Sequence, residues 1–431
     1  MSEARYEAYT YSYPHKTAYR PFAAPLPLAD LWREEDRSAL FLYVHVPFCE
    51  MRCGFCNLFT TANPRGDLAA RYLDTLEVQA RAVRDALGDA RFARVALGGG
   101  TPTFLSPAQL ERVFDLVEGV FGASVRALPT SLETSPRTAT RAHLELAKAR
   151  GVDRISIGVQ SFDDDELRAL GRPSTREAAV AALDRIAAVG FETRNVDLIY
   201  GARGQTRESF SRSLDVALGH APEEVYLYPL YVRPLTGLDR SARRASDERA
   251  ILYEHGRERL LAAGYLQRSL RMFQRPSARD APAYRCQEDG MVGLGCGARS
   301  YTRAVHYSDD FAVGRTPIRG ILEAWVDRPA ASFTAAHHGI VLDAEEQRRR
   351  WVIQSLGHAD GLDRAAYAAR FGTSVDHDFA AELAELRGQG LLTDDGERLA
   401  PTAEGFAWAD CVGPWLYSRE VRARMRELEL R

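Results

Sequence analysis

The feature that most constrains the fold of this chain is an alternation, between about residue 40 and residue 265, of short aliphatic runs with longer amphipathic runs. Short runs rich in β-branched residues predict strands, whereas apolar residues spaced three and four apart predict helices. Strands that alternate with helices of this length imply parallel strands joined by right-handed crossovers. The predicted strands are 41–46, 94–97, 125–128, 154–159, 195–200 and 225–230, and the helices that follow them are 68–87, 107–121, 140–150, 175–189, 207–218 and 247–263.

Six strand–helix units are too few for a closed eight-unit barrel. They fit an α/β fold built as a partial, three-quarter (βα)6 TIM-like barrel, or alternatively a doubly wound sheet. In both architectures, functional residues gather at the C-terminal ends of the strands. The motifs described below follow these strand ends one after another, which is the strongest argument for an architecture of this kind, and we predict the partial barrel.

The sequence divides into four predicted parts. A Tyr- and Pro-rich N-terminal arm (1–38), expected to lie extended on the barrel, precedes the barrel (39–270). A barrel-closing segment (271–335) then leads to a small C-terminal domain (336–431). In that domain, residues 344–356 and 379–388 predict helices, and the Asp-Gly pair at 395–396 predicts a hairpin turn. Helices followed by a hairpin indicate a winged-helix-like domain.

Composition excludes several classes of function. The chain has 431 residues, 56 Lys and Arg against 59 Asp and Glu, and a net charge of −3, so no basic field favours nucleic acid or anionic lipid. No apolar run is long enough for a membrane helix, and the N-terminus has no apolar signal segment. We therefore expect a cytoplasmic enzyme that binds neither nucleic acid nor membrane.

Three of the six cysteines, Cys49, Cys53 and Cys56, fall on one short loop directly after the first predicted strand. A [4Fe–4S] cluster usually takes four cysteines, so three leave one iron without a protein ligand. An amine and a carboxylate, as in the methionine part of S-adenosylmethionine (SAM), could chelate that iron. The alternatives are a structural zinc site with His45 or a distant cysteine as fourth ligand, and three packed cysteines without a metal. Zinc sites more often pair two C-x2-C motifs, and no second pair exists here.

The spacing C-x3-C-x2-C resembles that of the radical SAM superfamily. The surrounding segments resemble the oxygen-independent coproporphyrinogen III oxidase (coproporphyrinogen dehydrogenase) family, and they occur in the same order. The N-terminal Tyr9–Pro14 also resembles the arm of that family. The resembling segments are 43–56, 98–103, 154–162, 170–172, 196–201 and 293–298.

The resemblance implies a [4Fe–4S] cluster and one or two molecules of SAM. Cleavage of SAM by an electron from the cluster then yields a 5′-deoxyadenosyl radical, which abstracts hydrogen from a small organic substrate. The electron comes from a flavodoxin- or ferredoxin-type donor. The residues implied to hold the cluster and to carry catalysis are Cys49, Cys53 and Cys56, and those implied to bind SAM are Tyr43, Phe55, Gly99, Gly100, Thr101, Glu133, Gln160, Arg172 and Asp197.

The residues themselves support these roles to different degrees. A glycine run lets a backbone approach a ligand closely, but glycines also make plain turns. Glu133 could equally be a solvated surface charge. Asp197 lies in an otherwise apolar strand and needs a partner; Arg172 could be that partner, or could clamp a ligand carboxylate. Tyr43 and Phe55 could be ordinary core residues.

Residues 293–299 are expected to close the site. By resemblance, the surroundings of that loop and of Tyr228-Pro229 could bind a second SAM, and Cys296 is either a hydrogen donor or a packed thiol. The chain departs from the family at three substrate-facing places. Pro173-Ser174 stand where a histidine is usual, and residues 201–206 and 233–237 differ from the usual loops. Specificity is set in such loops.

The leading functional prediction is a radical SAM oxidoreductase, either a coproporphyrinogen III oxidase that decarboxylates oxidatively in porphyrin biosynthesis, or a divergent relative. Such a relative could be a methylase or a cyclopropane-forming enzyme. The alternative from another class is a heme-binding chaperone. A DNA-binding regulator fits poorly, because the C-terminal domain carries acidic residues where phosphate binding needs clustered Lys or Arg.

Overall fold

The computed structural model describes residues 4–10, 12–64, 66–239, 248–276 and 290–428. The contacts divide the chain into two compact units. The barrel unit contains the described residues of 19–239 and 290–341, and the C-terminal unit contains those of 4–18, 248–276 and 342–428. This division groups the start of the arm with the C-terminal residues. The four-part division drawn from the sequence stays a prediction.

Six parallel strands form the centre of the barrel unit, and neighbours in the chain are neighbours in the sheet. Each pair is parallel throughout, as the crossover argument predicts. The α/β class and the partial barrel are confirmed. The strands are β2 (Leu40–Val46), β5 (Phe92–Gly99), β6 (Thr130–Thr134), β7 (Arg154–Gln160), β8 (Thr193–Tyr200) and β9 (Glu224–Pro229).

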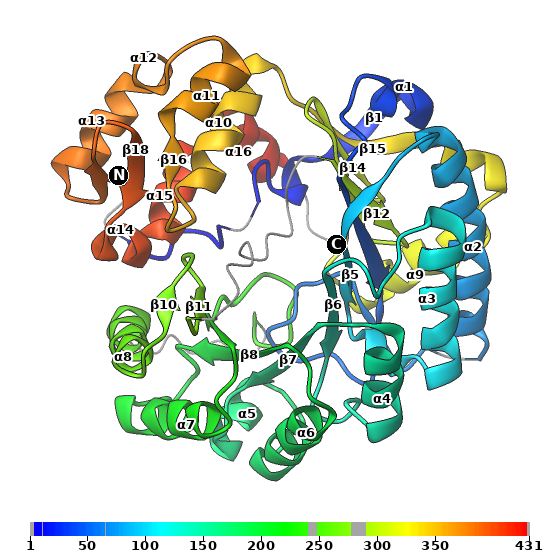
Figure 1. The fold of residues 1–431 in the computed structure, drawn as a ribbon, viewed down its shortest axis with the longest axis horizontal. Coiled ribbons are helices and arrows are strands. Elements are labelled where there is room, and N and C mark those ends of the chain that lie inside the picture. The colour runs from blue at the N-terminus through cyan, green and yellow to red at the C-terminus, as the bar shows by residue number, and fades with distance from the viewer. Residues whose placement is uncertain (1–3, 11, 65, 240–247, 277–289, 429–431) are drawn as a thin grey trace. The chain divides into compact units, whose positions relative to one another are not determined.

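Helices cover the outer face of this sheet, where Figure 1 shows them following the strands in order. Local sequence sets their ends. For example, Ser106 and Gln109 form a capping box at the start of α3, and Gly122 ends that helix in the left-handed conformation. The short helix α5 was not predicted. The helices are α2 (Leu68–Leu87), α3 (Pro107–Phe121), α4 (Arg141–Arg150), α5 (Asp164–Ala169), α6 (Arg176–Val189) and α7 (Arg207–Gly219).

The predicted third strand, 125–128, is wrong. These residues form a turn in which the backbone N–H groups of Ala127 and Leu128 donate to the carbonyl oxygen of Ser124. The strand begins after Pro129, whose fixed φ favours an extended entry. The aliphatic run was misleading because the true strand, Thr130–Thr134, is rich in small polar residues that are buried between neighbouring strands.

Beyond β2 the sheet continues with strands that the sequence analysis did not identify. Strand β12 pairs parallel with β2, and the next strands are antiparallel. The last of them pairs with β1, which is the C-terminal part of the arm. The remaining elements of this unit are β1 (Arg20–Pro27), α1 (Leu28–Arg33), β3 (Phe48–Cys49), β4 (Thr61–Ala62), η2 (Pro102–Phe104), β12 (Met291–Leu294), β13 (Arg299–Tyr301), β14 (Val305–Ser308), α9 (Arg315–Val326), η4 (Ala330–Thr334) and β15 (Ala335–Val341).

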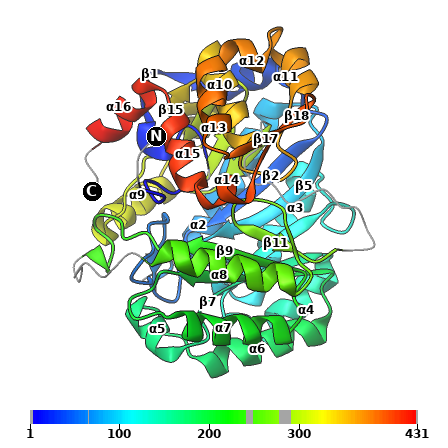
Figure 2. The same cartoon turned by 90° about the vertical axis from the view of Figure 1, so that its left-hand side faces the viewer.

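The C-terminal unit consists of helices around a small three-stranded antiparallel sheet, and Figure 2 shows helices α10 to α15 gathered around strands β17 and β18. The helices and the hairpin predicted for this region are confirmed. The elements are η1 (Lys16–Ala18), α8 (Arg249–Ala262), β10 (Leu266–Gln267), β11 (Met272–Gln274), α10 (Ala344–Ser355), β16 (Leu362–Asp363), α11 (Arg364–Phe371), α12 (Val375–Asp378), α13 (Ala380–Gly388), β17 (Leu392–Asp394), β18 (Arg398–Pro401), α14 (Ala403–Ala407), α15 (Ala409–Leu416) and α16 (Arg419–Glu427).

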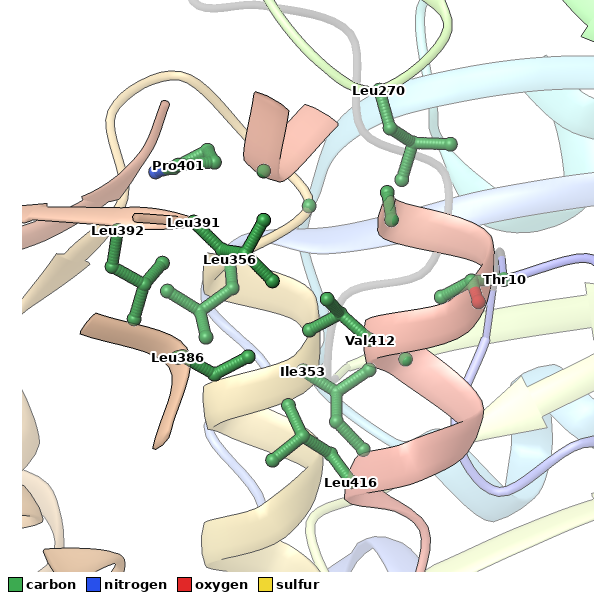
Figure 3. Close-up of a pocket in the computed structure, with 14 residues that line it drawn as sticks. Thr10, Leu270, Ile353, Leu356, Leu386, Leu391, Leu392, Pro401, Val412 and Leu416 are labelled. Atoms are coloured by element: carbon green, nitrogen blue, oxygen red, sulfur yellow. The ribbon is translucent and has the colours of Figure 1, made fainter. Parts of the chain in front are cut away.

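The start of the arm is part of the core of this unit. The backbone N–H of Thr10 donates to Asp410, and the hydroxyl of Tyr13 donates to Glu346. Thr10 also lines an apolar cavity of about 20 Å³, with Ile353, Val412 and other aliphatic side chains around it (Figure 3). That volume holds about one water-sized molecule, so the cavity is a packing defect of the core. In the described part of the chain, no helix is both long and apolar enough to cross a bilayer.

Candidate functional site

The cysteine loop is anchored at both of its ends. It leaves the sheet after β2, and Cys49 lies on β3, which pairs with β4 at the far end of the loop. The backbone N–H of Asn63 donates to the carbonyl oxygen of Cys49 at 3.0 Å, and that of Cys56 donates to Cys53 at 3.2 Å. The loop therefore holds three half-buried thiols on a short, fixed backbone.

A junction of three glycines fixes the middle of the loop. The N–H of Gly54 donates to the carbonyl oxygens of Leu170 and Gly171 at 3.0 and 3.2 Å, and its own carbonyl accepts from Leu238 at 2.9 Å. A methyl group on Gly171 would lie 3.0 Å from the Cα of Gly54, and one on Gly237 would lie equally close. The loop is therefore in backbone contact with the segment after α5 and with the loop after β9.

Arg172 follows this junction and points at the cluster loop. Its Nη1 lies 3.2 Å from the Sγ of Cys53, and its Nη2 donates to the carbonyl oxygen of Gly158. Its buried Nε has no hydrogen-bond partner among the described residues. A guanidinium beside a thiol stabilises the thiolate, which is the form that binds iron.

Hydroxyl groups serve the first cysteine in the same way. The hydroxyls of Thr60 and Thr101 donate to the Sγ of Cys49, at 3.3 and 3.6 Å. Burial raises the pKa of the Cys49 thiol, and these two hydrogen bonds offset part of that effect. Burial, and then the nearby thiols of Cys53 and Cys49, raise the pKa of Cys56 to about 11. Bound iron would reverse this balance, because a metal cation favours the thiolate.

The residues present fit a [4Fe–4S] cluster. Cys49, Cys53 and Cys56 could each bind a different iron of the cube, with Thr60, Thr101 and Arg172 as donors to their sulfurs. Across the described ranges, no group of three or more His, Cys, Asp or Glu is arranged to hold a metal ion. The ligands of a cube do not need such convergence, since they bind separate irons.

His45, the candidate zinc ligand, is occupied elsewhere. Its Nε2 lies 3.0 Å from the carbonyl oxygen of Phe59, and its Nδ1 lies 3.1 Å from the hydroxyl of Tyr43. The ring is buried between these partners. Both nitrogens are therefore used within the protein, which disfavours the zinc alternative that relies on His45.

The glycine segment 98–101 lies directly against the cysteine loop. The N–H groups of Gly100 and Thr101 donate to the carbonyl oxygens of Val46 and Phe48, both at 2.8 Å. A methyl group on Gly100 would lie 2.5 Å from the carbonyl oxygen of Phe48 and 3.0 Å from the Sγ of Cys49. Only glycine fits this approach. The segment thus places a backbone next to a thiol, and its N–H groups already donate within the protein. A contact with a ligand, which the resemblance implies, stays a prediction.

Glu133 stands at the strand end beside this segment, where the N–H of Gly99 donates to its carboxylate at 3.1 Å. The side chain keeps accessible surface, yet protein surrounds it at longer range. This desolvation, and then the charge of Asp197, raise the pKa of Glu133 to about 7. A carboxylate that is poorly solvated and has one donor is suited to accept further donors from a ligand.

Asp197 lies on the neighbouring part of the sheet, in β8. Burial raises its pKa to about 6, although Asn195 Nδ2 donates to its carboxylate at 2.8 Å. Arg172 and Asp197 form no ion pair in the described structure, because Arg172 bonds to Cys53 and Gly158 instead. The observed partner of Asp197 is therefore Asn195 and not Arg172. The alternative role of Arg172, as a clamp on a ligand carboxylate, stays a prediction.

Gln160, at the end of β7, has a strained backbone. Its φ is 76°, in the left-handed region that a residue with a side chain rarely adopts, and the pairing of β7 with β8 shifts register there. The amide Nε2 lies over Gly158, where a methyl group would approach it to 2.8 Å. Strain of this kind concentrates at ligand sites.

The two aromatic candidates occupy different surroundings. Phe55 packs against the apolar cluster of Leu170, Ile199 and Ala202 at the ends of the later strands. Tyr43 packs against the cluster of Phe41, Ala96, Met291 and Tyr301, and its hydroxyl faces His45. The structure thus places all twelve predicted residues in the barrel unit, with Tyr43 and Asp197 inside strands β2 and β8. The roles of these residues toward SAM stay predictions.

Three residues of the site were not identified from the sequence. Thr60 and Asn195 were passed over because single Thr and Asn side chains are common in loops and strands. Arg154 could have been identified, because an arginine at the start of an otherwise apolar strand indicates a buried partner of opposite charge. It forms a buried ion pair with Glu224 at 2.8 Å, and its positive charge offsets part of the rise in the pKa values of Glu133 and Asp197.

The segment 201–206, which departs from the family, is rigid rather than open. The Oε1 of Gln205 accepts from the N–H of Gly201 at 2.6 Å, and its Nε2 donates to Glu166 at 3.0 Å. Glu166 is buried and also accepts from Ser161 and Ser209. The segment is therefore a turn fixed by the amide of Gln205.

The loop 293–299 lies next to the cluster segment. A methyl group on Gly295 would lie 2.6 Å from the carbonyl oxygen of His45, and one on Gly297 would lie 2.6 Å from the Phe59 ring. Cys296 between them is fully buried, which raises the pKa of its thiol well above the usual value. This burial favours the packed thiol over the hydrogen donor.

Comparison with known proteins gives the same picture for both units. A family model described as the radical SAM superfamily matches residues 43–217, and one described as the HemN C-terminal domain matches residues 342–408. The heme chaperone HemW of Mycobacterium tuberculosis is 30% identical over 86% of this chain and 93% of its own length. The oxygen-independent coproporphyrinogen III oxidase of Salmonella typhimurium is 28% identical over 93% of this chain and 91% of its own.

Among solved structures, the coproporphyrinogen III oxidase HemN of Escherichia coli, described as a radical SAM enzyme, superimposes with a TM-score of 0.81 at 25% identity. The match covers 95% of this chain and 96% of that one. Both the barrel unit and the C-terminal unit are thus shared with that protein. The chain belongs to the radical SAM superfamily, in the family that contains the oxygen-independent coproporphyrinogen III oxidases and the HemW heme chaperones.

Proposed function

We propose that this protein is an enzyme that cleaves SAM reductively and uses the resulting 5′-deoxyadenosyl radical to abstract hydrogen from an organic substrate. The main support for the proposal is that three predicted parts of the SAM site lie next to one another. The cysteine loop, the glycine segment 98–101 and Arg172 meet at one end of the sheet, with Arg172 at 3.2 Å from Cys53 and Thr101 at 3.6 Å from Cys49.

In this proposal three groups of residues have separate roles in binding and cleaving SAM. Cys49, Cys53 and Cys56 hold the cluster, which supplies an electron and an open iron. The backbone of residues 99–101 receives the methionine part, since it lies against the Cys49 thiol. Glu133 accepts from the amine or the ribose, because its carboxylate has a single protein donor.

The substrate we propose is coproporphyrinogen III, whose propionates are decarboxylated oxidatively. Removal of a hydrogen atom from the propionate carbon next to the ring, followed by loss of CO2 and of one electron to an acceptor, leaves a vinyl group. Two observations support this activity over the chaperone. The solved structure of the Escherichia coli oxidase matches 95% of this chain with a TM-score of 0.81, and the start of the arm is built into the C-terminal unit.

The test is anaerobic reconstitution of the full chain with iron and sulfide, followed by reduction in the presence of SAM. The proposal expects 5′-deoxyadenosine, and with coproporphyrinogen III and an electron acceptor it expects protoporphyrinogen IX and CO2. A Cys53→Ser variant serves as the control that should form neither. SAM cleavage without any decarboxylation would leave the radical chemistry standing and redirect the substrate to another organic molecule, where methylase or cyclopropane-forming activity would be tested.

A second candidate is a heme-binding chaperone, which the 30% identity to HemW favours. The departures at Pro173-Ser174 and in the loops 201–206 and 233–237 affect the substrate-facing side and are compatible with it. A heme titration distinguishes the two. A stoichiometric Soret shift together with no decarboxylation would favour the chaperone, whereas decarboxylation with multiple turnovers would exclude that role as the principal one.

A further inference from the structure

We propose that Glu166 is a positioning residue of the SAM site, and that its buried carboxylate fixes the geometry of Gln160 and Arg172. Glu166 lies on the short helix α5 and is only 3% exposed. The inference rests on the proposed function and deepens it, because it concerns how that same site is held in place.

Three neutral donors surround this carboxylate. Ser161 Oγ and Gln205 Nε2 donate to the Oε2 of Glu166, at 2.6 and 3.0 Å. Ser209 Oγ donates to its Oε1 at 2.5 Å. The donors come from the end of β7, the turn after β8 and the start of α7, and all three residues are buried. A buried charge is costly unless it is fully hydrogen-bonded, so the carboxylate holds these three segments in one arrangement.

The first donor belongs to the strained end of β7. Ser161 directly follows Gln160, whose φ is 76°. The Oγ of Ser161 also accepts from the N–H of Asp163 at 2.9 Å, so this hydroxyl is fixed from two sides. Without Glu166 the hydroxyl would lose its acceptor. The left-handed backbone that directs the Gln160 side chain would then be held less firmly.

The second donor, Gln205, fixes the turn after β8. Its Oε1 accepts from the N–H groups of residues 201 and 202, at 2.6 and 3.3 Å. Its Nε2 donates to the carbonyl oxygen of Ile199 at 3.2 Å as well as to Glu166. Ile199 is part of the apolar cluster against which Phe55 packs. The carboxylate therefore also supports the wall that holds the aromatic ring of the cysteine loop.

The backbone of α5 carries the effect to the cysteine loop itself. The N–H of Leu170 donates to the carbonyl oxygen of Glu166 at 2.8 Å, and the N–H of Arg172 donates to that of Leu167 at 2.9 Å. The carbonyl oxygen of Leu170 in turn accepts from Gly54 at 3.0 Å. A displacement of α5 would therefore move the guanidinium of Arg172 relative to the cysteines.

The test removes the carboxylate from the full chain. Glu166→Leu leaves an apolar side chain of similar size. Two of the donors keep a second acceptor, since Gln205 Nε2 also lies 3.2 Å from the carbonyl oxygen of Ile199. Likewise, Ser209 Oγ lies 3.2 Å from the carbonyl oxygen of Thr206, so the chain should still fold. Glu166→Gln keeps the shape and one acceptor oxygen, and should restore the wild-type arrangement.

The matched control is Glu346→Leu, which makes the same change on α10 in the C-terminal unit. Glu346 is also buried, and it accepts from the hydroxyl of Tyr13. Its loss should lower the stability of that unit and leave SAM binding unchanged. Ser161→Ala, which removes one donor and keeps the carboxylate, gives a milder test that does not depend on the folding of Glu166→Leu.

Hydrogen exchange on the chain without cluster or SAM reads the positioning directly. In Glu166→Leu, we expect about tenfold faster exchange in residues 160–172 and 199–206, and no change in α2 and α3. Glu166→Gln should stay within about threefold of the wild type. This measurement does not depend on SAM, so a loss of positioning and a failure of the proposed function are distinguishable.

Titration of SAM into the anaerobically reconstituted chain reads the consequence for the site. We expect the dissociation constant to rise about tenfold in Glu166→Leu and about threefold in Ser161→Ala, because small displacements of binding groups are costly. Glu166→Gln should stay within about threefold of the wild type, and Glu346→Leu within about twofold.

Three results would overturn the proposal. An unchanged dissociation constant in Glu166→Leu, beside faster exchange, would make the residue merely structural. An equal rise in Glu346→Leu would assign the effect to general instability. A Glu166→Gln variant as weak as Glu166→Leu would show that the charge, and not the hydrogen-bonded position, is what matters. A wild-type chain that carries the cluster but binds no SAM would instead refute the proposed function itself.

Discussion

The two units hold their carboxylates in opposite ways: Asp410 is buried and paired, whereas Glu133 and Asp197 keep accessible surface and are only partly hydrogen-bonded. In the C-terminal unit, both carboxylate oxygens of Asp410 accept from the Nη2 of Arg271 at 2.6 Å. One of them also accepts from the backbone N–H of Thr10. In the barrel unit, Glu133 and Asp197 each accept one hydrogen bond from the described residues and form no ion pair with them. The first arrangement fixes an architecture, while the second leaves acceptor capacity unused.

This difference indicates which carboxylates stabilise the fold by themselves and which are costly to keep charged without a ligand. A fully paired buried carboxylate needs no ligand, and Asp410 ties the start of the arm to the C-terminal helices. A partly satisfied carboxylate is costly to keep charged, as the raised pKa values of Glu133 and Asp197 indicate. A ligand that donates to such a carboxylate can offset this cost. We therefore expect Asp410 to have a structural role, and Glu133 and Asp197 to have a role in ligand binding.

The largest effect is expected from breaking the paired site. Replacement of Arg271 by Met leaves the carboxylate of Asp410 buried without its cation, which should lower the free energy of unfolding of the C-terminal unit by about 3–5 kcal/mol. Hydrogen exchange, read segment by segment, should show faster exchange in residues 342–428 than in the barrel. A second variant, Arg271→Met with Asp410→Leu, removes both charges and should recover most of the loss. Equal exchange in both units of the single variant would contradict this role.

The next largest effect concerns the glycine junction that holds the cysteine loop. Gly171→Ala places a methyl group 3.0 Å from the backbone of Gly54 at a φ of 60°. We expect the rate of SAM cleavage per cluster to fall about 10- to 100-fold, because displacements of this size misplace reacting groups.

The matched control for this prediction is Gly190→Ala. Gly190 also has a positive φ, 76°, but a methyl group there meets nothing within 4 Å. It carries the same backbone strain of about 1 kcal/mol without the contact. Similar loss of cleavage in both variants would show that strain alone, and not contact with the cysteine loop, explains the result.

The sequence predicted the regular part of this molecule well. Helices 68–87 and 107–121 match the structure residue for residue. The cap Ser106, the proline at 107 and Gly122 mark the limits of the second helix, and Gly88 marks the end of the first. The third strand failed where burial was achieved by small polar residues, as in Thr130–Thr134, since such a strand has no apolar signal. The antiparallel strands 299–308 were missed because short strands of an extended sheet depend on long-range pairing.

For the site, motifs located the residues but not their partners. The cysteine spacing placed three thiols on one loop. No pattern in the neighbouring sequence predicts that Thr60 donates to Cys49, or that Arg172 contacts Cys53 instead of Asp197. Those contacts join residues more than a hundred positions apart, or depend on the turn of a loop. The three-glycine junction was likewise invisible, because a lone glycine in sequence does not reveal which backbone approaches it.

A moderate effect is expected at the under-satisfied site. Glu133→Gln should weaken SAM binding about tenfold, since a neutral amide accepts less strongly from an amine. The same change should raise the free energy of unfolding of the barrel by about 1 kcal/mol at about pH 8, because it removes a desolvated charge; this figure is discounted for the water that reaches the side chain. Isothermal titration and thermal unfolding measure the two.

An exposed carboxylate gives the control for that variant. Glu111→Gln, on the outer face of α3, should change neither SAM binding nor stability beyond the error of the measurements. A barrel that becomes less stable with Glu133→Gln would refute the view that this carboxylate is kept at a cost and would make Glu133 a structural residue like Asp410.

The smallest effect is the response to pH, in which the two units should differ in sign. Glu133 and Asp197 have pKa values of about 7 and about 6, above their unfolded values of 4.5 and 3.8, so their stabilisation is complete only below those unfolded values. It is lost as pH rises through about 4 to 7. In the C-terminal unit, Arg364 lowers the pKa of Asp394, so that contribution is present above the unfolded value and is lost as pH falls.

Segment-resolved hydrogen exchange between about pH 5 and pH 8, corrected for intrinsic rates, therefore sharpens the comparison. Surface carboxylates of the barrel such as Asp163 and Glu223 have lowered pKa values and act in the opposite direction. The difference between wild type and Glu133→Gln isolates the functional carboxylate from them. We expect this difference to grow from about pH 5 to about pH 8 and then to level, because Glu133, with a folded pKa of about 7, is almost fully ionised in both states only about one pH unit above that value. A difference that stays constant over this range would mean that the environment of Glu133 is no harsher for its charge than water, and the contrast between the two units would no longer hold.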